Sequence, residues 1–260
     1  MAANDPGQPA LAVQGWSRDL PTPSSVLAIG AHPDDVEFGA GGTLAKWAAG
    51  GCTVHHLICT DGSKGTWDIG ADLHALVSRR QIEQREAARR LAGVAPGCGG
   101  VGEVVFLGRV DGDLRSDRDT VSDVARIIRR LRPDVVLGHD PWKRYRLHPD
   151  HRHAGWLTCD AIVAARDPHF FPEHGLDHHR PSTLLLWEAD EANHVEDVSA
   201  QVDTKLRALE AHESQFETTM HAVDASQLDP FRERIRQRLA DLGSPHGLHA
   251  AELCTLLTDL

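Results

Sequence analysis

The sequence predicts an α/β fold, with an open, mainly parallel sheet and helices on both faces. Three observations support this prediction. Apolar runs of strand length alternate with amphipathic segments of helix length from residue 26 to residue 209. The short runs are continuously apolar, as expected for strands covered on both faces. Polar side chains, many of them aspartates, follow the ends of these runs, where ligands bind in such sheets.

The predicted elements follow one another in a regular order. Strands are expected at 26–29, 53–59, 104–107, 135–137 and 183–187. Helices are expected at 36–50, 73–92, 121–131, from residue 149 onward, at 198–209 and around 231–242. Strands that alternate with helices imply right-handed crossovers and a Rossmann-like arrangement.

Composition limits the classes of function. With 260 residues, 41% of them hydrophobic and 25% charged, one globular domain spanning 1–260 is expected, with an irregular lead-in at 1–24 and a variable extension at 217–260. The net charge of −11 argues against a nucleic-acid partner. No apolar stretch is long enough for membrane insertion, and the first residues lack the apolar region of a signal peptide. The five cysteines are scattered, so neither a disulfide framework nor a CxxC zinc site is indicated. We therefore expect a cytoplasmic protein, and a homo-oligomer is compatible with the sequence.

Two short motifs combine histidine, proline and carboxylate. Ala-His-Pro-Asp-Asp occupies 31–35, directly after the first predicted strand, and His-Pro-Asp-His occupies 148–151, at a predicted helix start. Catalytic zinc usually has three protein ligands and leaves one position open. His32 and Asp35 are close enough in sequence to bind one ion together, and His151 is the best candidate for the third ligand. The adjacent Asp34 would then face the reacting water and serve as its general base.

The second motif offers further roles. His148 would face the other side of a substrate, where it could stabilise an oxyanion or donate a proton to a leaving amine. Asp150 could orient an imidazole. Each motif also has a purely structural explanation, because paired aspartates can cap a helix and His-Pro-Asp-His can be an ordinary helix start.

The helix expected at 73–92 carries charges within its apolar stripe. Arg80, Glu83 and Gln84 fall on the inward face, where an unpaired charge is unfavourable. An Arg80–Glu83 pair near a polar site is one interpretation, and an exposed edge of the stripe is the other.

Together these segments resemble the PIG-L/LmbE-like zinc-dependent N-deacetylases. The resemblance rests on 31–35, on Thr60-Asp61-Gly62 after the second strand, on 148–151, and on Ala-His-Glu-Ser-Gln at 211–215, and it spans roughly 26–216. It implies hydrolysis of an N-acetyl group on an N-acetylglucosamine unit of a small-molecule conjugate.

The resemblance also implies roles by position. Zinc, one ion per chain and with iron(II) as an alternative, would be held by His32, Asp35 and His151, with Asp34 as base and His148 as acid or electrophile. The expected substrate contacts are Arg80, Asp111, Asp61 and His212. The basic and aromatic 142–146 loop, the 168–181 stretch and the tail beyond 217 depart from the family, so we expect them to shape recognition of the aglycone. The 168–181 stretch is expected beside the site, where it is either a lid or a surface loop of no consequence.

Two other functions stay open on the sequence alone. The first is an amidase that acts on a thiol or xenobiotic conjugate. The second is a non-catalytic module that binds a sugar conjugate, although such a module would have no need of the second carboxylate, Asp34. No Gly-rich phosphate loop and no GxSxG nucleophile motif occur in the chain.

Overall fold

The computed structural model describes residues 16–93 and 100–260. Its centre is a sheet of eight strands in the order β1-β7-β8-β6-β5-β2-β3-β4. The five expected strands are all present: β2 (Ser25–Gly30), β3 (Thr53–Thr60), β4 (Val101–Arg109), β5 (Val135–His139) and β6 (Thr183–Trp187). Every pair of neighbouring strands within this set of five is parallel. The predicted fold class is therefore confirmed.

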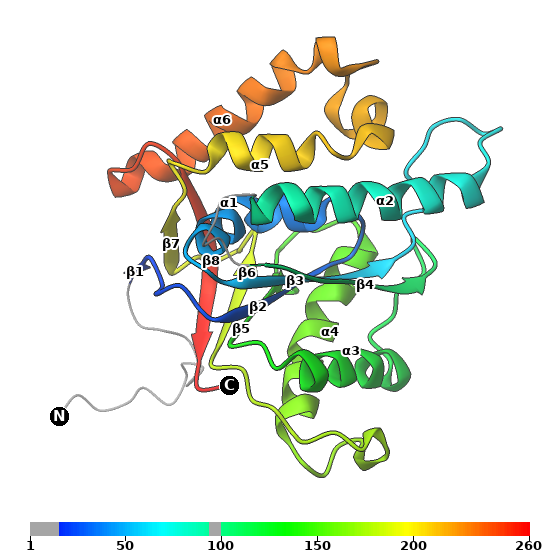
Figure 1. Cartoon of the computed structure of the whole chain (residues 1–260), viewed down its shortest axis with the longest axis vertical. Helices are drawn as coiled ribbons and strands as arrows, with labels where there is room; N and C mark the ends of the chain where they lie inside the picture. The colour runs from blue at the N-terminus through cyan, green and yellow to red at the C-terminus, as the bar shows by residue number, and fades with distance from the viewer. Residues whose placement is uncertain (1–15, 94–99) are drawn as a thin grey trace.

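The order of the strands fixes where a ligand can bind. The five parallel strands start with β2, continue with β3 and β4 to one side, and then place β5 and β6 on the other side of β2 (Figure 1). The strand order therefore reverses between β2 and β5. In open α/β sheets the crevice beyond the carboxyl ends of such a strand pair is the usual ligand site.

Helices cover both faces, as the sequence predicted. On one face lie α1 (Asp35–Ala49), α2 (Leu73–Ala92) and α5 (Val202–Leu209), with α6 (Asp229–Gly243) outside them, and on the other lie α3 (Arg118–Leu131) and α4 (Pro149–Arg166) (Figure 1). The bounds of α2 agree with the expected 73–92. Its start is explained by the Asp72 carboxylate, which accepts hydrogen bonds from the backbone N–H groups of His74 and Ala75.

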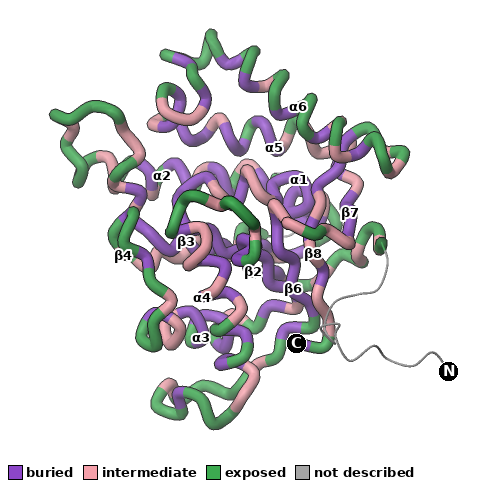
Figure 2. Tube along the Cα trace, turned by 180° about the vertical axis from the view of Figure 1, so that it is seen from behind, coloured by how far each residue is buried: buried purple, intermediate pink, exposed green. Residues whose placement is uncertain are grey.

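The hydrophobic core has one layer on each face of the central strands, and alternate side chains of β2 point into the two layers. Val26 and Ala28 pack in the cluster that contains Trp47 of α1, whereas Leu27 and Ile29 pack in the cluster of α3 and α4. Successive residues of a strand point to opposite faces, so a strand buried on both sides is apolar throughout. Figure 2 shows this burial concentrated in the central strands and in α1.

The far edge of the sheet was not predicted. β7 (His194–Asp197) and β8 (Ala251–Thr258) lie beyond β6, and β8 runs antiparallel to both of its neighbours. The chain therefore returns to the sheet after α6 instead of ending outside it. Within the lead-in that we expected to be irregular, Ser17–Arg18 forms the short edge strand β1 and pairs with β7. Residues 1–15 of that lead-in lie outside the described residues.

A buried ion pair supports a break in α1. The backbone at Ala40 is not helical. The second half of α1 therefore starts with backbone N–H groups that have no partner within the helix. Glu252 of β8 accepts hydrogen bonds from the N–H groups of Gly42 and Thr43, at 2.9 and 2.8 Å. Lys205 of α5 pairs with Glu252 at 2.6 Å and donates to the carbonyl of Phe38 at 2.8 Å. Side chains from α5 and β8 thus fix the first turn of α1, which carries the Asp34-Asp35 pair.

The 168–181 stretch is not where we expected it. Buried Arg129 holds it to the end of α4 by donating to the carbonyls of Ala165, Asp167 and Phe170, at 3.1, 2.9 and 2.8 Å. The segment leaves α4 at its C-terminal end, away from the helix start that carries His148. None of its residues lines the cavities described below, so its expected place beside the site is wrong and the alternative of a surface loop agrees with the structure.

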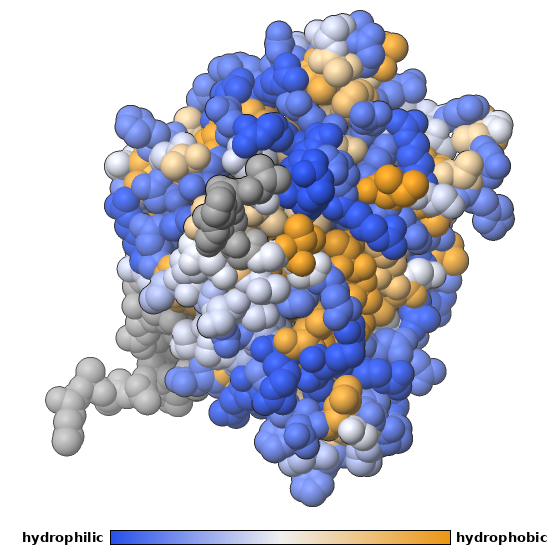
Figure 3. All heavy atoms as spheres, viewed as in Figure 1, coloured by the Kyte–Doolittle hydropathy of each residue, from blue (hydrophilic) through white to orange (hydrophobic). Residues whose placement is uncertain are grey.

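The surface is largely polar, and hydrophilic residues cover most of the face seen in Figure 3. Among the described residues, no helix is long and apolar enough to cross a membrane. Cys52, Cys59, Cys159 and Cys254 are free thiols, and Cys98 lies outside the described residues.

Candidate metal centre and its surroundings

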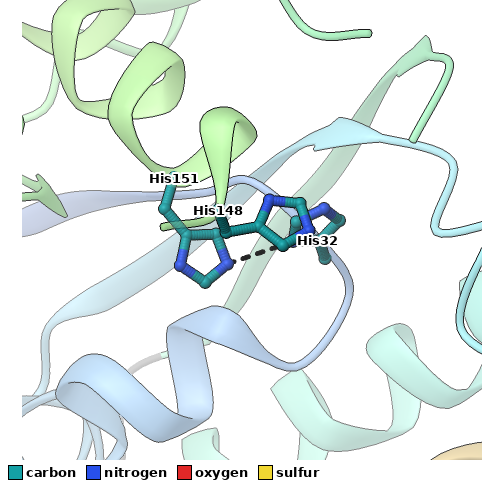
Figure 4. Close-up of side chains that lie close together, drawn as sticks. All are labelled: His32, His148 and His151. Carbon is teal, nitrogen blue, oxygen red and sulfur yellow. Dashed lines mark hydrogen bonds between the residues drawn. The ribbon is translucent and has the colours of Figure 1, made fainter. Parts of the chain in front are cut away.

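Residues from two distant parts of the chain meet at the reversal of strand order. His32 lies in the turn after β2, and His148 and His151 lie at the start of α4, which follows β5 (Figure 4). His148 is the N-cap residue of α4 and Pro149 is its first helical residue, as the sequence predicted. Proline at this position suits a helix start because its missing N–H has no partner there in any case.

The three expected ligands are close enough to share one ion. His151 Nε2 lies 3.3 Å from His32 Nδ1 and 3.3 Å from Asp35 Oδ1. Asp35 Oδ2 lies 3.3 Å from His32 Nδ1. Zinc bonds of about 2.0–2.2 Å in tetrahedral geometry place neighbouring ligand atoms about 3.3–3.6 Å apart. Asp35 meets His32 through Oδ2 and His151 through Oδ1, so the two contacts use different carboxylate oxygens. His32, His148 and His151 also have ligand atoms within 4.8 Å of one another. The donor types and their proximity therefore fit a cation such as zinc.

The electrostatic surroundings also favour a cation. His32 Nε2 lies 3.2 Å from Asp150 Oδ2 and 3.3 Å from Asp111 Oδ1. Burial by itself would lower the pKa of His32, but hydrogen bonds to Asp111, Asp150 and Asp35 outweigh it and raise the pKa to about 12. Three carboxylates around one imidazole thus create a site that attracts positive charge.

Asp150 has the position that an orienting residue requires. Its side chain is completely buried, and the backbone N–H groups of Gly112 and Leu114 donate to it at 2.6 and 3.2 Å. The carboxylate is therefore fixed before it meets His32. An acceptor at Nε2 leaves Nδ1 of the same ring free for a metal.

Sequence reasoning missed His139, the last residue of β5. Its Nε2 lies 3.3 Å from Asp35 Oδ2, and the indole N–H of Trp187 donates to its Nδ1 at 3.1 Å. Although burial opposes the effect, His151 and His139 hold the pKa of Asp35 well below its usual range. Asp35, His139 and His151 also have ligand atoms within 4.8 Å of one another. The available signal was a histidine at the carboxyl end of a strand beside the point of reversal.

Asp34 is held in an unusual backbone conformation beside the three ligands. Its φ of 103° is in a region that non-glycine residues rarely adopt. Arg80 Nη2 donates to the carbonyl of Pro33 at 2.6 Å and lies 3.5 Å from Asp34 Oδ2. Burial raises the pKa of Asp34 to about 6, against the opposing effect of the Arg80 guanidinium. A carboxylate that gains and loses a proton near neutral pH is suited to general base catalysis.

Arg80 points inward, as predicted, but its expected partner was wrong. Glu83 pairs with Arg79 at 2.8 Å and accepts hydrogen bonds from the N–H and hydroxyl of Ser214, at 2.9 and 2.5 Å. Arg80 instead bridges two turns, because it donates to the carbonyl of Pro33 in the turn after β2 and to the carbonyl of Gly62 in the loop after β3, the latter at 2.8 Å. Gly62 has a φ of 65°, and a Cβ there would lie 2.6 Å from the guanidinium, so glycine is required for this approach.

A buried polar network supports Asp34 from behind. Gln84 Oε1 accepts the backbone N–H of Asp34 at 3.0 Å, and Gln84 Nε2 donates to Glu37 Oε1 at 2.8 Å. Glu37 Oε2 in turn lies 3.2 Å from His212 Nε2. Gln84, Glu37 and His212 have no exposed surface. Gln84 was expected on the inward face of its helix, and the structure confirms this. Glu37 was not singled out, because a buried carboxylate on a helix has no distinctive motif.

Two residues expected to contact substrate lie elsewhere. His212 is fully buried against Glu37, so the structure places it behind Asp34 and not in the cavity. Asp61 accepts hydrogen bonds from the N–H groups of Ser63 and Asp111, at 3.0 and 3.1 Å, and joins two loops. Arg80 and Asp111, the other two expected contacts, do line the cavity.

The cavity over the site has a volume of about 580 Å³. Its floor is formed by the candidate ligands with Asp34, and His148 stands at its wall, with ring centroids 4.6 Å from His32 and 4.9 Å from His151. Burial, followed by the neighbouring imidazoles of His32 and His151, lowers the pKa of His148. Thr218 and Arg238, from the C-terminal extension, complete the opposite wall.

Known proteins resemble this chain in sequence and in fold. A family profile described as PIG-L: GlcNAc-PI de-N-acetylase matches residues 27–162, more than half of the chain. The chain belongs to the PIG-L family. Its matched region runs from β2 through most of α4 and so includes every candidate ligand.

Individual relatives of this PIG-L protein agree with the family match. Diacetylchitobiose deacetylase of Thermococcus kodakarensis is 38% identical over 194 residues, which are 74% of this chain and 70% of the relative. A 1D-myo-inositol 2-acetamido-2-deoxy-alpha-D-glucopyranoside deacetylase of Rhodococcus erythropolis is 34% identical over 168 residues, 58% of this chain and 56% of that relative. The structure of N,N'-diacetylchitobiose deacetylase from Pyrococcus horikoshii, in complex with its inhibitor MPG, superposes with a TM-score of 0.80 at 29% identity and covers 91% of this chain and 84% of that one.

Proposed function

We propose that this PIG-L protein is a metal-dependent hydrolase that removes the N-acetyl group from an N-acetylglucosamine-type aminosugar conjugate and releases acetate and a free amine. The observation that carries the proposal is the convergence of His32, Asp35 and His151 at 3.3 Å, with Asp34 beside them in one cavity. The relatives named above are deacetylases of acetylated aminosugars, which supports the same substrate class.

The metal ligands in this proposal are His32, Asp35 and His151, and the metal is zinc, with iron(II) as the alternative. A zinc ion in such a site acts as a Lewis acid and makes water a usable nucleophile near neutral pH. The set of two imidazoles and one carboxylate is typical of catalytic zinc. Asp150 and His139 keep His32 and Asp35 in place through the contacts at 3.2 and 3.3 Å.

Asp34 acts as the general base in this proposal. It takes a proton from the water that attacks the acetyl carbon, and its pKa of about 6 leaves it ionised and ready at neutral pH. Arg80 keeps the turn that presents Asp34 closed, through the carbonyl of Pro33. His148 faces the reacting carbonyl from the wall of the cavity, where its N–H can donate to the oxyanion.

The test is mass spectrometry of a library of N-acetylated conjugates after incubation with zinc-loaded protein. We expect loss of one acetyl group from aminosugar conjugates, abolished by a chelator and restored by zinc. Cysteinyl conjugates in the same library serve as the matched amide controls. Product from cysteinyl conjugates alone would replace the proposed substrate class, and tight binding without any product would contradict an enzymatic function.

Asp34→Asn is the matched variant for the mechanism. It keeps the size of the side chain and removes the base, so we expect turnover to fall by about 10²–10⁴-fold. Bound zinc, measured by elemental analysis, should stay stoichiometric because Asp34 is not among the proposed ligands. Turnover within a factor of two of the unaltered protein would contradict the assignment of the base.

A further inference from the structure

A second cavity lies beside the catalytic one. It has a volume of about 230 Å³ and shares Phe38, Gly39, Glu188 and Arg238 with the catalytic cavity. At Gly39 a Cβ would come within 2.6 Å of the Trp187 ring, so glycine is required there for packing on Trp187. Because the two cavities share four lining residues, a molecule bound over the metal ligands lies next to this side chamber.

The side chamber carries an excess of positive charge. Its lining includes the cations Lys143, Arg146, Lys205 and Arg238 and the carboxylates Glu188 and Glu252, a net charge of +2 from four positive and two negative groups. The chain as a whole has a net charge of −11, so this excess does not reflect the average composition. Glu188 and Arg238 line both cavities, whereas Lys143, Arg146 and the Lys205–Glu252 pair line the side chamber alone.

Only part of that charge is neutralised internally. Lys205 and Glu252 form the buried pair at 2.6 Å that supports α1, and they cancel. Arg146 and Arg238 share the single carboxylate of Glu188, which Arg238 meets at 3.3 Å. Lys143 Nζ donates to the carbonyl of Ala189 at 3.1 Å and forms no ion pair with a described residue. Apart from the Lys205–Glu252 pair, the lining of the chamber thus contains three cations and one anion.

The rest of the chamber is apolar and comes from the C-terminal extension. Ile235, Leu239 and Leu242 of α6 and Leu253 of β8 line it. Ile235 and Leu239 are 8% and 3% exposed, so this wall is packed in place. Charge–charge attraction is stronger beside such a surface than in open water, because the surrounding dielectric is lower.

We propose that the side chamber is the subsite for the aglycone and that it selects an aglycone bearing an anionic group, a carboxylate or a phosphate. This inference rests on the proposed function, because the sugar must occupy the catalytic cavity for the aglycone to reach the chamber. The anion meets Lys143 and the guanidinium of Arg238, and planar guanidinium groups bind carboxylate and phosphate through two parallel hydrogen bonds. The apolar wall takes the hydrocarbon part of the same aglycone.

The test compares N-acetylglucosamine conjugates of matched size whose aglycones carry a carboxylate, a phosphate or a neutral amide. For the unaltered protein we expect kcat/KM to be about tenfold higher for an anionic conjugate than for the neutral one, which corresponds to about 1.4 kcal/mol. The carboxylate and phosphate arms show which anion is preferred. The preference should shrink as salt is raised, because ions screen partly exposed charges.

Variants locate the effect. Lys143→Gln and Arg238→Gln should each lower the ratio of kcat/KM for anionic over neutral conjugates severalfold. Arg236→Gln is the matched control, because Arg236 lies on the same helix, pairs with Asp203 at 3.3 Å and lines neither cavity. An unchanged ratio in both chamber variants, or an equal loss in the control, would overturn the subsite.

Calorimetry separates failure of the subsite from failure of the proposed function. The same conjugates are titrated into the zinc-loaded protein, and the anionic ones should bind about tenfold more tightly than the neutral one. If no conjugate is deacetylated but the anionic ones bind more tightly, the proposed function fails and the subsite stands. Equal affinity for neutral and anionic conjugates refutes the subsite whatever the turnover.

Discussion

Gln84→Leu is the substitution that most directly tests whether the buried network positions the base. Gln84 donates to Glu37 at 2.8 Å and accepts from the N–H of Asp34 at 3.0 Å, and it has no exposed surface. Leucine has a similar size but can make neither bond. The substitution therefore removes polar contacts without opening a large cavity.

The magnitude follows from what is left unpaired. A buried N–H or carboxylate that loses its partner costs about 1–3 kcal/mol, and the unusual φ of Asp34 is itself unfavourable by about 1–3 kcal/mol unless its surroundings enforce it. We expect the free energy of unfolding to fall by about 2–5 kcal/mol from the two lost bonds. Once the turn can relax, Asp34 moves away from the attacking water, and kcat should fall by about 10–100-fold, or about 1.4–2.7 kcal/mol.

The assay measures acetate release, zinc content and urea unfolding for three proteins. Gln81→Leu is the control, because Gln81 is on the same helix, is partly buried, and its side chain makes no hydrogen bond with a described residue. We expect Gln84→Leu to lower kcat with little change in KM and to keep its zinc. If its kcat equals that of Gln81→Leu while its stability falls as expected, the network supports only the fold, and the positioning argument is refuted.

Three further predictions concern pH, metal and stability. Because the pKa of Asp34 is raised to about 6 and the base must be ionised, kcat/KM should fall as the pH drops through that value or somewhat below it, and a rate that stays flat down to pH about 4 would contradict this. Removing the metal with a chelator should abolish acetate release and lower Tm, because an ion that binds only the native state stabilises it, whereas His151→Ala should show neither release nor a Tm response to zinc. Glu252→Leu should lower the free energy of unfolding in urea by about 3–5 kcal/mol, because it leaves Lys205 charged and buried without its partner. The double variant with Lys205→Met should recover part of that loss, and an additive loss would show that the ion pair is not the cause.

The sequence was a good guide where a local pattern decides the structure. The apolar runs at 26–29 and 183–187 became strands because their hydrophobicity on both faces suits only a covered sheet. His148 and Pro149 started a helix because proline at the first helical position is favoured whatever the fold. The convergence of His32, Asp35 and His151 could be predicted because parallel strands bring their carboxyl ends to one edge.

The sequence was a poor guide where a partner far along the chain decides. Strand β8 has an apolar pattern no clearer than its surroundings, and it forms because β6 and β7 leave a place between them. Arg80 was correctly placed inward, but its partners are backbone carbonyls of distant turns, which no helical spacing reveals. His212 had a motif that marked it as important, yet only the fold shows that it lies behind Asp34.

By itself the sequence determined the type of sheet, the edge at which polar groups gather and the kinds of ligand atom that meet there, because hydrophobic period, proline position and residue chemistry act locally. The tertiary structure decided which polar groups face the cavity and which support it from behind. It also decided that the last strand and helix, and not the 168–181 stretch, build the side chamber. The reason is that burial and electrostatic environment depend on every segment packed around a side chain, and the segments around Asp34 and Glu188 come from both ends of the chain.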